Sequence, residues 1–456
     1  MDKISPRKND VVTIEITGMT AEGSGVGRTT DGMAVFVPAA AVGDTAEVVL
    51  VKVLKSYAFG KILALKSAAN TRITPDCAAF PQCGGCVFRH ISYAEELRIK
   101  DGFVRDSFAR IGKLDVPFEP PEAAPETARY RNKAQFPVAE KDGKAVCGFY
   151  AKNSHRVIPV ADCALEPEVF LRLTARVLEY VNRQHIAPYD ERTGKGLLRH
   201  IYLRRGAHTG ETMVCLVTAD NAADEFRPLA QALTAEFPEI VSVVLNVNRC
   251  DTNVILGNKT LVLAGRETIT DRMCGNEITL SPHAFYQVNT PAAEGLYRIA
   301  AEYAELTGAE TLLDLYCGAG TIGLSMAGKA KKVIGVEEVA PAIANARANA
   351  AANGITNAEF LCGDAGKTAE LLLARGERPN VIIADPARKG CDQTALDAML
   401  ALAPERIVMI SCNHATAARD CAYLCANGYR AVRARAVDLF PRTGHVETCV
   451  LMSRNI

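Results

Sequence analysis

A cysteine and a glutamate near the end of the chain have the types and spacing needed for covalent catalysis. Cys412 follows an apolar stretch at residues 406–411, and Glu447 ends a second motif at residues 440–447. A thiol at the carboxyl end of a strand lies where open α/β sheets bind ligands, and a carboxylate can perform the proton transfer that a thiol mechanism needs. The pair predicts a cysteine nucleophile, although a free cysteine also occurs as a small buried apolar residue.

The elements expected around this pair are those of a nucleotide-binding sheet. A strand pattern at residues 311–316 precedes a glycine-rich turn at 317–323, and a second strand pattern at 332–337 ends in Glu337. Glycine lets the backbone turn sharply, and the following helix presents free N–H groups to a ligand. Because an acid about twenty residues beyond the first glycine is typical of a dinucleotide site, NAD is one alternative for the cofactor.

Three features favour S-adenosylmethionine instead. Asp314 stands just before the glycines, where a carboxylate would repel a pyrophosphate but can hold the amino-acid part of S-adenosylmethionine. Asp364 follows a third strand pattern at residues 358–361 and is placed to meet the adenine. The chain ends in two strand patterns, residues 429–439 and 445–452, which we expect to form an antiparallel hairpin on the sheet edge.

Four motifs in this order resemble those of the RNA (uracil-5-)-methyltransferases, in particular the bacterial 23S rRNA type that carries an iron–sulfur cluster. They are residues 314–320, 385–390, 411–413 and 443–447. The resemblance covers most of the chain and implies a Rossmann-like class I methyltransferase that forms 5-methyluridine with S-adenosylmethionine. Its tRNA-specific relatives generally lack an N-terminal barrel and a cysteine cluster, so the resemblance favours 23S rRNA over tRNA as the substrate.

The same resemblance implies roles for individual residues. Cys412 would add to C6 of uracil, C5 would attack the sulfonium methyl group, and Glu447 would remove the C5 proton. Phe285 would stack on the substrate base. The implied cofactor contacts are Gln287, Tyr316, Gly318, Glu337, Asp364 and Asp385. Relatives often carry Asn at the position of Thr321, and this departure leaves the contact of Thr321 unassigned.

A second cysteine cluster near the N-terminus has the spacing of a metal centre. Cys77, Cys83 and Cys86 lie in a turn-rich segment whose two glycines allow backbone N–H groups to face sulfur. The spacing is compatible with an iron–sulfur cluster or with zinc. The resemblance supplies Cys163 as the fourth ligand and implies a structural [4Fe–4S] cluster. A disulfide framework is not expected, because the first residues are too polar for a signal peptide and cytoplasmic thiols stay reduced.

Composition indicates a large soluble enzyme of the cytoplasm. The 456 residues allow two to four domains, and 48% hydrophobic residues permit large cores. No uninterrupted apolar run reaches the length needed to span a membrane. The balance of 52 basic and 52 acidic residues argues mildly against an RNA partner. Two local groups of basic residues nevertheless favour RNA contact: Arg129, Arg131, Lys133, Lys141, Lys144, Lys152 and Arg156, and then Arg199, Arg204 and Arg205.

The chain divides into three expected domains. Residues 1–68 alternate short strand patterns with glycine-rich turns, which predicts an OB-like β-barrel that resembles the RNA-binding TRAM module. Residues 69–279 predict an α+β central domain with the cysteine cluster, in which a helical segment at 93–124 packs on the catalytic domain. Residues 280–456 form the expected methyltransferase domain. The partner is RNA, and no obligate protein partner is inferred.

Two functions from other classes remain as alternatives. The first is an RNA-binding protein with an inactive methyltransferase fold, and the presence of Cys412, Glu447 and the glycine turn argues against it. The second is a redox or NAD enzyme, and Asp314 argues against that. Within the favoured class, tRNA is the alternative substrate.

Overall fold

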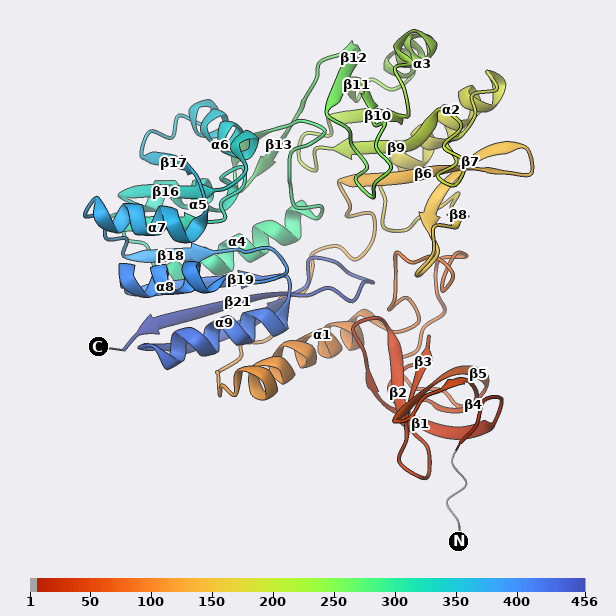
Figure 1. The fold of residues 1–456 in the computed structure, drawn as a ribbon, viewed down its shortest axis with the longest axis horizontal. Helices are drawn as coiled ribbons and strands as arrows, with labels where there is room; N and C mark the ends of the chain where they lie inside the picture. Colours follow the sequence, from red (N-terminus) through yellow and green to blue (C-terminus); the bar gives the residue numbers. More distant parts are fainter. Residues whose placement is uncertain (1–5, 456) are drawn as a thin grey trace.

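The computed structural model describes residues 6–455 and shows three parts in chain order (Figure 1). A small barrel comes first, a sheet with two helices follows, and a second sheet with helices on both faces ends the chain. None of the helices within these residues is both long enough and apolar enough to cross a membrane.

The N-terminal part is a closed barrel of five strands in the order β1-β2-β3-β5-β4. Inward and outward side chains alternate along these strands, so that Ile14, Val35 and Leu50 fill the barrel. This confirms the predicted OB-like barrel. Its strands are β1 (Val11–Met19), β2 (Ser24–Arg28), β3 (Ala34–Pro38), β4 (Thr45–Val53) and β5 (Tyr57–Ser67).

The segment after the barrel packs on the C-terminal sheet before the chain enters the central part. Helix α1 (Tyr93–Ser107) begins at Ser92, whose hydroxyl accepts a hydrogen bond from the N–H of Glu95, and it continues into a π-turn (Phe108–Gly112). Val104 and Phe108 pack into the core of the C-terminal sheet. The chain then runs beside strand β20 (Tyr429–Val437), where Phe118 and Glu122 form parallel bridges.

The central part is a seven-stranded sheet in the order β12-β11-β10-β9-β6-β7-β8. Helices α2 (Glu168–Arg183) and α3 (Ala223–Glu236) cover one face, and the opposite face joins the core formed by helix α4 (Thr290–Ala304) and the hairpin β13–β14. The strands of the seven-stranded sheet are β6 (Lys133–Lys141), β7 (Lys144–Tyr150), β8 (Val157–Pro159), β9 (Leu198–Arg205), β10 (Thr212–Thr218), β11 (Ile240–Val247) and β12 (Lys259–Gly265). The hairpin is a separate two-stranded sheet of β13 (Ile269–Met273) and β14 (Asn276–Leu280).

The C-terminal part is a seven-stranded sheet in the order β17-β16-β15-β18-β19-β21-β20. The first five strands in this order are parallel, and the last two add the expected antiparallel pair at the edge. This confirms the class I methyltransferase sheet. The remaining strands are β15 (Thr311–Leu315), β16 (Lys332–Glu337), β17 (Ala358–Cys362), β18 (Val381–Ala384), β19 (Arg406–Ser411) and β21 (Glu447–Arg454).

Helices cover both faces of this sheet, and α4 lies with α5 against one of them. Helix α1 from the N-terminal half joins α7, α8 and α9 on the other face. The helices not yet bounded are α5 (Thr321–Met326), α6 (Ala340–Ala352), α7 (Ala365–Ala374), α8 (Gln393–Leu402) and α9 (His414–Ala426).

Candidate active site

The residues expected to do chemistry follow neighbouring strands at one edge of the C-terminal sheet. Strands β16, β15, β18 and β19 are adjacent and parallel, so their carboxyl ends meet at the same edge. Glu337 ends β16, Tyr316 follows β15, Asp385 follows β18 and Cys412 follows β19. The sheet therefore brings residues from four separate motifs to one ligand-binding edge.

Cys412 and Glu447 lie opposite each other on antiparallel strands. Ser411 of β19 pairs with Thr448 of β21, so Cys412 and Glu447 are the next residues on each side of that pair. The Glu447 side chain is buried, whereas Cys412 is half-buried. Burial raises the pKa of Glu447 to about 8, with a further contribution from Asp385, and the charge of Arg388 opposes the rise. Burial also raises the pKa of the Cys412 thiol, and Glu447 adds to this effect.

Arg388 connects the two motifs that carry this pair. Its carbonyl accepts a hydrogen bond from Nδ2 of Asn413 at 3.0 Å, beside Cys412. Its Nη2 lies 3.4 Å from Nε2 of His445, two residues before Glu447. The guanidinium lowers the pKa of both Cys412 and Glu447 against the effect of burial. The charge of Arg388 thus acts on both the thiol and the carboxyl. The sequence analysis did not single out this residue.

A group of carboxyls lies on strands β15 and β16 and directly after β18, at the same edge. Asp314 is fully buried; its Oδ2 accepts a hydrogen bond from the N–H of Gly323 at 2.8 Å, and its Oδ1 has no partner within the described residues. Burial raises the pKa of Asp314 to about 7 and that of Asp385 to about 6. Glu337 Oε2 accepts from the N–H of Gly318 at 3.2 Å. An unpartnered buried carboxylate oxygen beside other acids fits a ligand with cationic groups, such as the sulfonium and ammonium of S-adenosylmethionine.

The other residues expected to contact the cofactor follow strands β15 and β17. Tyr316 has a left-handed backbone with φ of 65°, which turns the chain sharply after β15. Asp364 caps helix α7, because its Oδ1 accepts a hydrogen bond from the N–H of Lys367 at 3.0 Å. The hydroxyl of Thr321, at the position where relatives often carry Asn, lies 3.2 Å from the hydroxyl of Tyr297.

The loop at residues 281–289 carries both Phe285 and Gln287. The ring of Phe285 is 70% exposed, as expected of a side chain that is free to stack on a ligand. The carbonyl of Gln287 accepts a hydrogen bond from Nδ2 of Asn132 at 2.8 Å. Nδ2 of Asn289 donates to the carbonyl of Leu439 at 3.0 Å, which ties the end of the loop to the segment before Glu447.

Two side chains of strand β9 in the central sheet donate hydrogen bonds to the same loop. Fully buried Arg204 donates to the carbonyls of Ser281 at 2.6 Å and Ala284 at 2.7 Å. The hydroxyl of Tyr202 donates to the carbonyl of Pro282 at 2.9 Å. The RNA contact expected of Arg204 is therefore wrong, because its guanidinium is used inside the protein.

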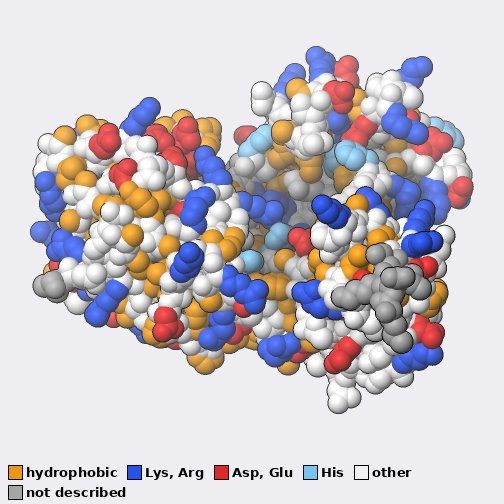
Figure 2. All heavy atoms as spheres, turned by 60° about the horizontal axis from the view of Figure 1, so that its bottom comes forward, with side chains coloured by type: hydrophobic (Ala, Val, Ile, Leu, Met, Phe, Trp, Pro, Cys, Tyr) orange, Lys and Arg blue, Asp and Glu red, His pale blue; other side chains and the backbone are white. Residues whose placement is uncertain are grey.

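The other basic residues expected to contact RNA differ in how exposed their side chains are. Arg199 is also buried, and its Nη1 donates to the carbonyls of Asn248 and Cys250, so its expected RNA contact is wrong as well. Both faces of β9 are covered by other elements, so nearly all its side chains are buried, whichever face they point to. The exposed members are Lys141, Lys144, Lys152 and Arg156, for which RNA contact stays a prediction. Figure 2 shows a hollow between the lobes of the molecule with Lys and Arg side chains along it.

The barrel reaches the catalytic edge through its first turn. A Cβ on Gly444 would lie 1.7 Å from the carbonyl oxygen of Ala21, so only glycine fits where the turn between β1 and β2 presses on the motif of Glu447. Nζ of Lys152 donates to the carbonyl of Glu22 at 2.7 Å, which joins the same turn to the central part. All three parts of the chain thus contact one another beside Glu447.

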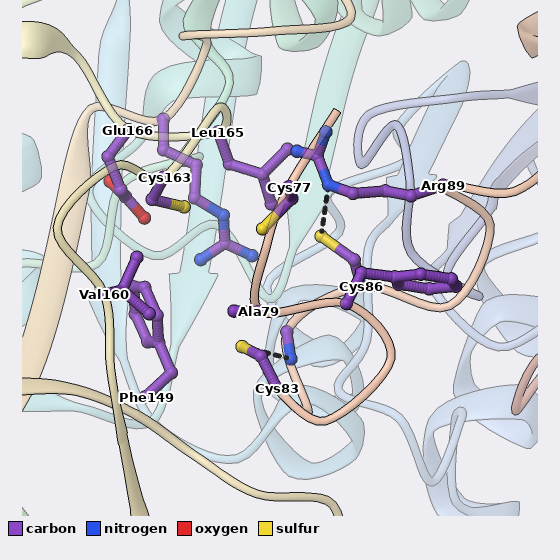
Figure 3. A pocket seen from close by; sticks show the side chains of 13 residues that line it. Cys77, Ala79, Cys83, Cys86, Arg89, Phe149, Val160, Cys163, Leu165 and Glu166 are labelled. Atoms are coloured by element: carbon purple, nitrogen blue, oxygen red, sulfur yellow. Dashed lines mark hydrogen bonds between the residues drawn. The ribbon is translucent and has the colours of Figure 1, made fainter. Parts of the chain in front are cut away.

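Four cysteines line one cavity between the segment after the barrel and the central part (Figure 3). They are Cys77, Cys83, Cys86 and Cys163. Within residues 6–455 no three His, Cys, Asp or Glu side chains are grouped closely enough to hold a single metal ion. Burial raises the pKa of Cys163 to about 12 and also raises that of Cys86.

Two arginines line this cavity with the cysteines. Nε of buried Arg89 donates to Sγ of Cys86 at 3.3 Å, and Arg89 also pairs with Asp76. Nη2 of Arg89 and Nε of Arg131 have no partner within the described residues. Unpartnered buried donors around four thiols fit an anionic group, and a thiolate-bound cluster is one.

Comparisons with known proteins agree with this arrangement. A family model described as tRNA (Uracil-5-)-methyltransferase matches residues 93–455, and a TRAM domain model matches residues 7–63. A protein of Halalkalibacterium halodurans described as an uncharacterized RNA methyltransferase is 42% identical over 446 residues, covering 98% of this chain and 97% of its own length. A protein of Clostridium tetani with the same description is 39% identical over 450 residues, covering 99% and 98%.

One solved structure superposes on nearly the whole chain. It is Pyrococcus abyssi tRNA (uracil-54, C5)-methyltransferase in complex with S-adenosyl-L-homocysteine, with a TM-score of 0.78 and 26% sequence identity. The match covers 97% of this chain and 99% of that one. The similarity therefore includes the barrel, the central part and the catalytic sheet.

Proposed function

Because the chain belongs to the tRNA (uracil-5-)-methyltransferase family, we propose that it methylates C5 of a uridine in 23S rRNA through a covalent adduct on Cys412. Family membership makes the protein an S-adenosylmethionine-dependent RNA (uracil-5-)-methyltransferase. The observation that carries the proposed mechanism is the placement of Cys412 opposite Glu447 at the ligand-binding edge of the sheet.

The cofactor would lie against the residues at the carboxyl ends of β15, β16 and β18. When bound, S-adenosylmethionine supplies an electrophilic methyl group. The unpartnered Oδ1 of Asp314 and the neighbouring carboxyls attract its cationic groups. The proposed contacts are Gln287, Tyr316, Gly318, Glu337, Asp364 and Asp385, and the exposed ring of Phe285 would stack on the substrate base.

The thiolate of Cys412 would form a bond to C6 of uracil, and the ring would become an enolate that is nucleophilic at C5. Because the pKa of the thiol is raised in the free protein, Cys412 must first give its proton to solvent before this attack. Arg388 favours the thiolate electrostatically. With a pKa of about 8, Glu447 is largely protonated near neutral pH and then repels the thiolate less than a charged carboxylate would.

Glu447 would act after C5 has accepted the methyl group. In its ionised form Glu447 takes the proton from C5, the electrons of the C5–H bond restore the C5–C6 double bond, the C6–S bond breaks, and the thiolate leaves. A carboxylate with a raised pKa is a stronger base than an exposed one, so burial suits Glu447 to this step. Its neighbour His445 is held by Arg388 and by the ring of Phe440, whose centroid lies 6.0 Å away.

Ribosomal RNA is the proposed substrate, and tRNA is the second candidate. The cysteine-lined cavity supports the resemblance to the iron–sulfur type of enzyme that acts on 23S rRNA. The Pyrococcus abyssi structure favours tRNA, because a tRNA enzyme superposes on 97% of this chain. The resemblance used the barrel as an argument for rRNA. A tRNA enzyme has the barrel too, so the barrel does not distinguish the two substrates.

Cys77, Cys83, Cys86 and Cys163 would hold a [4Fe–4S] cluster beside Arg89 and Arg131. Protein purified without oxygen should then be brown and contain about four iron atoms per chain. A colourless protein with stoichiometric zinc and full activity would contradict the cluster.

The decisive experiment maps 5-methyluridine by mass spectrometry in 23S rRNA and in tRNA from a deletion strain and its parent. Loss of one modified uridine from 23S rRNA, restored by the wild-type gene but not by the Cys412→Ala gene, is the expected result. Loss from tRNA alone would select the second candidate. No change in either RNA would contradict both.

A further inference from the structure

Helix α9 begins just after Cys412 and is tied to the loop between β18 and α8. This loop carries Arg388, whose guanidinium lies against His445 and favours the thiolate of Cys412. Near the start of the helix, Nδ2 of Asn413 and Oγ1 of Thr416 donate to the carbonyl of Arg388, at 3.0 and 3.5 Å. One helix end therefore holds both the thiol and the backbone of the cation that acts on it.

Two further residues of α9 hold the rest of the loop. Asp420 is buried, and its Oδ2 accepts a hydrogen bond from the N–H of Cys391 at 2.8 Å. Nε of Arg419 donates to Oδ1 of the same Asp420 at 2.7 Å. Nη2 of Arg419 donates to the carbonyls of Lys389 and Cys391, at 3.1 and 3.2 Å. These two residues of the helix, which we call the α9 clamp, thus satisfy three backbone groups in the segment that follows Arg388.

The loop approaches the clamp so closely that no side chain fits at Gly390. The φ of Gly390 is 77°, in the left-handed region that glycine favours. A Cβ at this position would lie 2.5 Å from Oδ2 of Asp420 and 2.6 Å from Nη2 of Arg419. The turn of the loop is therefore built directly against the two charged side chains of the clamp.

The charges that act on the thiol explain why the place of Arg388 matters. Burial raises the pKa of Cys412, and Glu447 of β21 and Asp385 of the same loop raise it further. The charge of Arg388 opposes these effects. Because electrostatic stabilisation weakens as two charges move apart, the loop must be held firmly for Arg388 to offset the two carboxyls.

We propose that Asp420 and Arg419 are positioning residues, which keep Arg388 where its charge stabilises the thiolate of Cys412. Neither residue takes part in bond making, and both act through the loop. The use of that thiolate in the reaction rests on the proposed function, whereas its stability in the free protein does not. A clamp that served the fold alone would stabilise the protein but leave the pKa of Cys412 unchanged.

The test follows alkylation of Cys412 by iodoacetamide as a function of pH, in the full-length protein without RNA. Mass spectrometry of the peptide that contains Cys412 separates it from the other cysteines, and only the thiolate reacts. Asp420→Ala should raise the apparent pKa of Cys412 and slow its alkylation about threefold at neutral pH, which corresponds to a rise of about half a unit. Removing a carboxylate would lower the pKa of a thiol by direct electrostatics, so a rise reports the displacement of Arg388.

Three further variants test the route of this effect. Arg419→Met changes a side chain that is 52% exposed, so it should fold even where Asp420→Ala does not, and it should also raise the pKa of Cys412. Arg388→Met should raise that pKa directly, and adding Asp420→Ala to it should raise the pKa no further, because both changes act through the same cation. Asp420→Asn keeps a carbonyl oxygen for the N–H of Cys391 and should lie closer to the wild type than Asp420→Ala.

Tyr423→Phe is the matched control on the same helix. The hydroxyl of Tyr423 donates to Asp397 of α8 at 2.6 Å, so the change breaks a hydrogen bond of α9 away from the loop and should leave the pKa of Cys412 unchanged. A wild-type pKa of Cys412 in either clamp variant that folds, or a further rise when Asp420→Ala is added to Arg388→Met, would overturn the proposal. The assay needs no RNA, so its outcome is independent of whether Cys412→Ala retains methylation, which tests the proposed function.

Discussion

In the free protein, the local environment of Cys412 and Glu447 keeps both side chains mostly uncharged. Burial raises the pKa of both groups, and Glu447 raises that of Cys412 further, so the free protein holds a neutral thiol next to a largely neutral carboxyl. A neutral thiol is a weak nucleophile and is protected from unwanted reactions. Arg388 supplies the opposing positive charge. We infer that entry of the base shifts this balance towards the thiolate.

Replacing the thiol tests the covalent step directly. Cys412→Ala should abolish methyl transfer but leave the affinity for S-adenosylmethionine nearly unchanged, because the thiol acts in the transition state and contributes little to ground-state binding. Isothermal titration with S-adenosyl-L-homocysteine and a tritium transfer assay measure the two quantities. Retained methylation would show that Cys412 is not the nucleophile.

Replacing the base should separate the two halves of the reaction. Glu447→Gln should methylate once and then stall as a protein–RNA adduct, because the C5 proton can no longer be removed. The adduct should run as a slow band on a denaturing gel and vanish in the double variant with Cys412→Ala. Wild-type protein should form a similar band with 5-fluorouridine RNA. Absence of any denaturant-stable band in all these cases would contradict covalent catalysis.

The pH dependence of this step follows from the raised pKa of Glu447. Only the deprotonated carboxyl can accept the C5 proton, so adduct breakdown should accelerate as pH rises and level off above a pH of about 8. Rapid quenching of pre-formed adduct at several pH values measures the rate. A midpoint near the ordinary glutamate value of 4.5 would contradict a buried base.

At the scale of elements, strand β9 of the central part holds the loop at residues 281–289 in place. Arg204 and Tyr202 donate three hydrogen bonds to consecutive stretches of the loop that carries Phe285 and Gln287. A buried arginine that satisfies two carbonyls cannot be removed without leaving them unpaired, at about 1–3 kcal/mol each. The central sheet therefore positions the site as well as completing the fold.

Arg204→Met should consequently impair catalysis as well as stability. We expect kcat/KM to fall at least about tenfold, because a loosened loop no longer holds its side chains ready for the base. Tyr202→Phe loses one hydrogen bond, worth about 1 kcal/mol, and should have a smaller effect. Steady-state kinetics with RNA and thermal unfolding measure both. Arg192→Met is the control, since that side chain is 90% exposed, and unchanged kinetics in Arg204→Met would contradict the positioning role.

The parts of the site that are easiest to predict from the sequence are those that directly follow a strand. The motif at residues 314–320 and the one at 411–413 each follow a strand, so the sheet alone brings them to one edge, and the methyltransferase sheet is confirmed. Arg204 shows why the roles of other residues could not be predicted from the sequence. Its basic neighbours suggested RNA contact, but its exposure depends on a loop that packs against β9 from residues 281–284, almost eighty positions away. Periodicity within a strand carries no information about that partner.

At the scale of the whole molecule, helix α1 fastens the catalytic end of the chain to its N-terminal half (Figure 1). Nζ of Lys100 donates to Glu96 at 2.7 Å, to Asp438 at 2.8 Å and to the carbonyl of Phe440 at 3.0 Å. All three charged side chains are fully buried. The N–H of Arg442 donates to the same Glu96 at 2.6 Å. The segment that leads to Glu447 is therefore held by charges on a helix more than three hundred residues earlier in the chain.

Lys100→Met should destabilise the protein by about 3–5 kcal/mol, because buried Asp438 loses its cation and buried Glu96 keeps only Arg442, whose Nη1 lies 3.6 Å from Glu96 Oε2. Burial already raises the pKa of Glu96, and Lys100 opposes that rise. Without Lys100 the carboxyl favours its protonated form more strongly in the folded state. The deficit relative to wild type should therefore be smallest at low pH and should grow as pH rises above the raised pKa of Glu96 in the folded wild type.

Thermal unfolding at a series of pH values measures this deficit, and two variants sharpen the test. Adding Glu96→Gln to Lys100→Met removes the buried carboxylate that has lost the Lys100 cation, and it should recover part of the stability at neutral pH. Lys66→Met breaks an exposed ion pair with Glu47 and should cost less than about 1 kcal/mol at any pH. Lys100→Met should also accumulate protein–RNA adduct, since Glu447 follows the segment that Lys100 holds. A pH-independent deficit with normal adduct breakdown would show that the buried charges support only the fold and not the base.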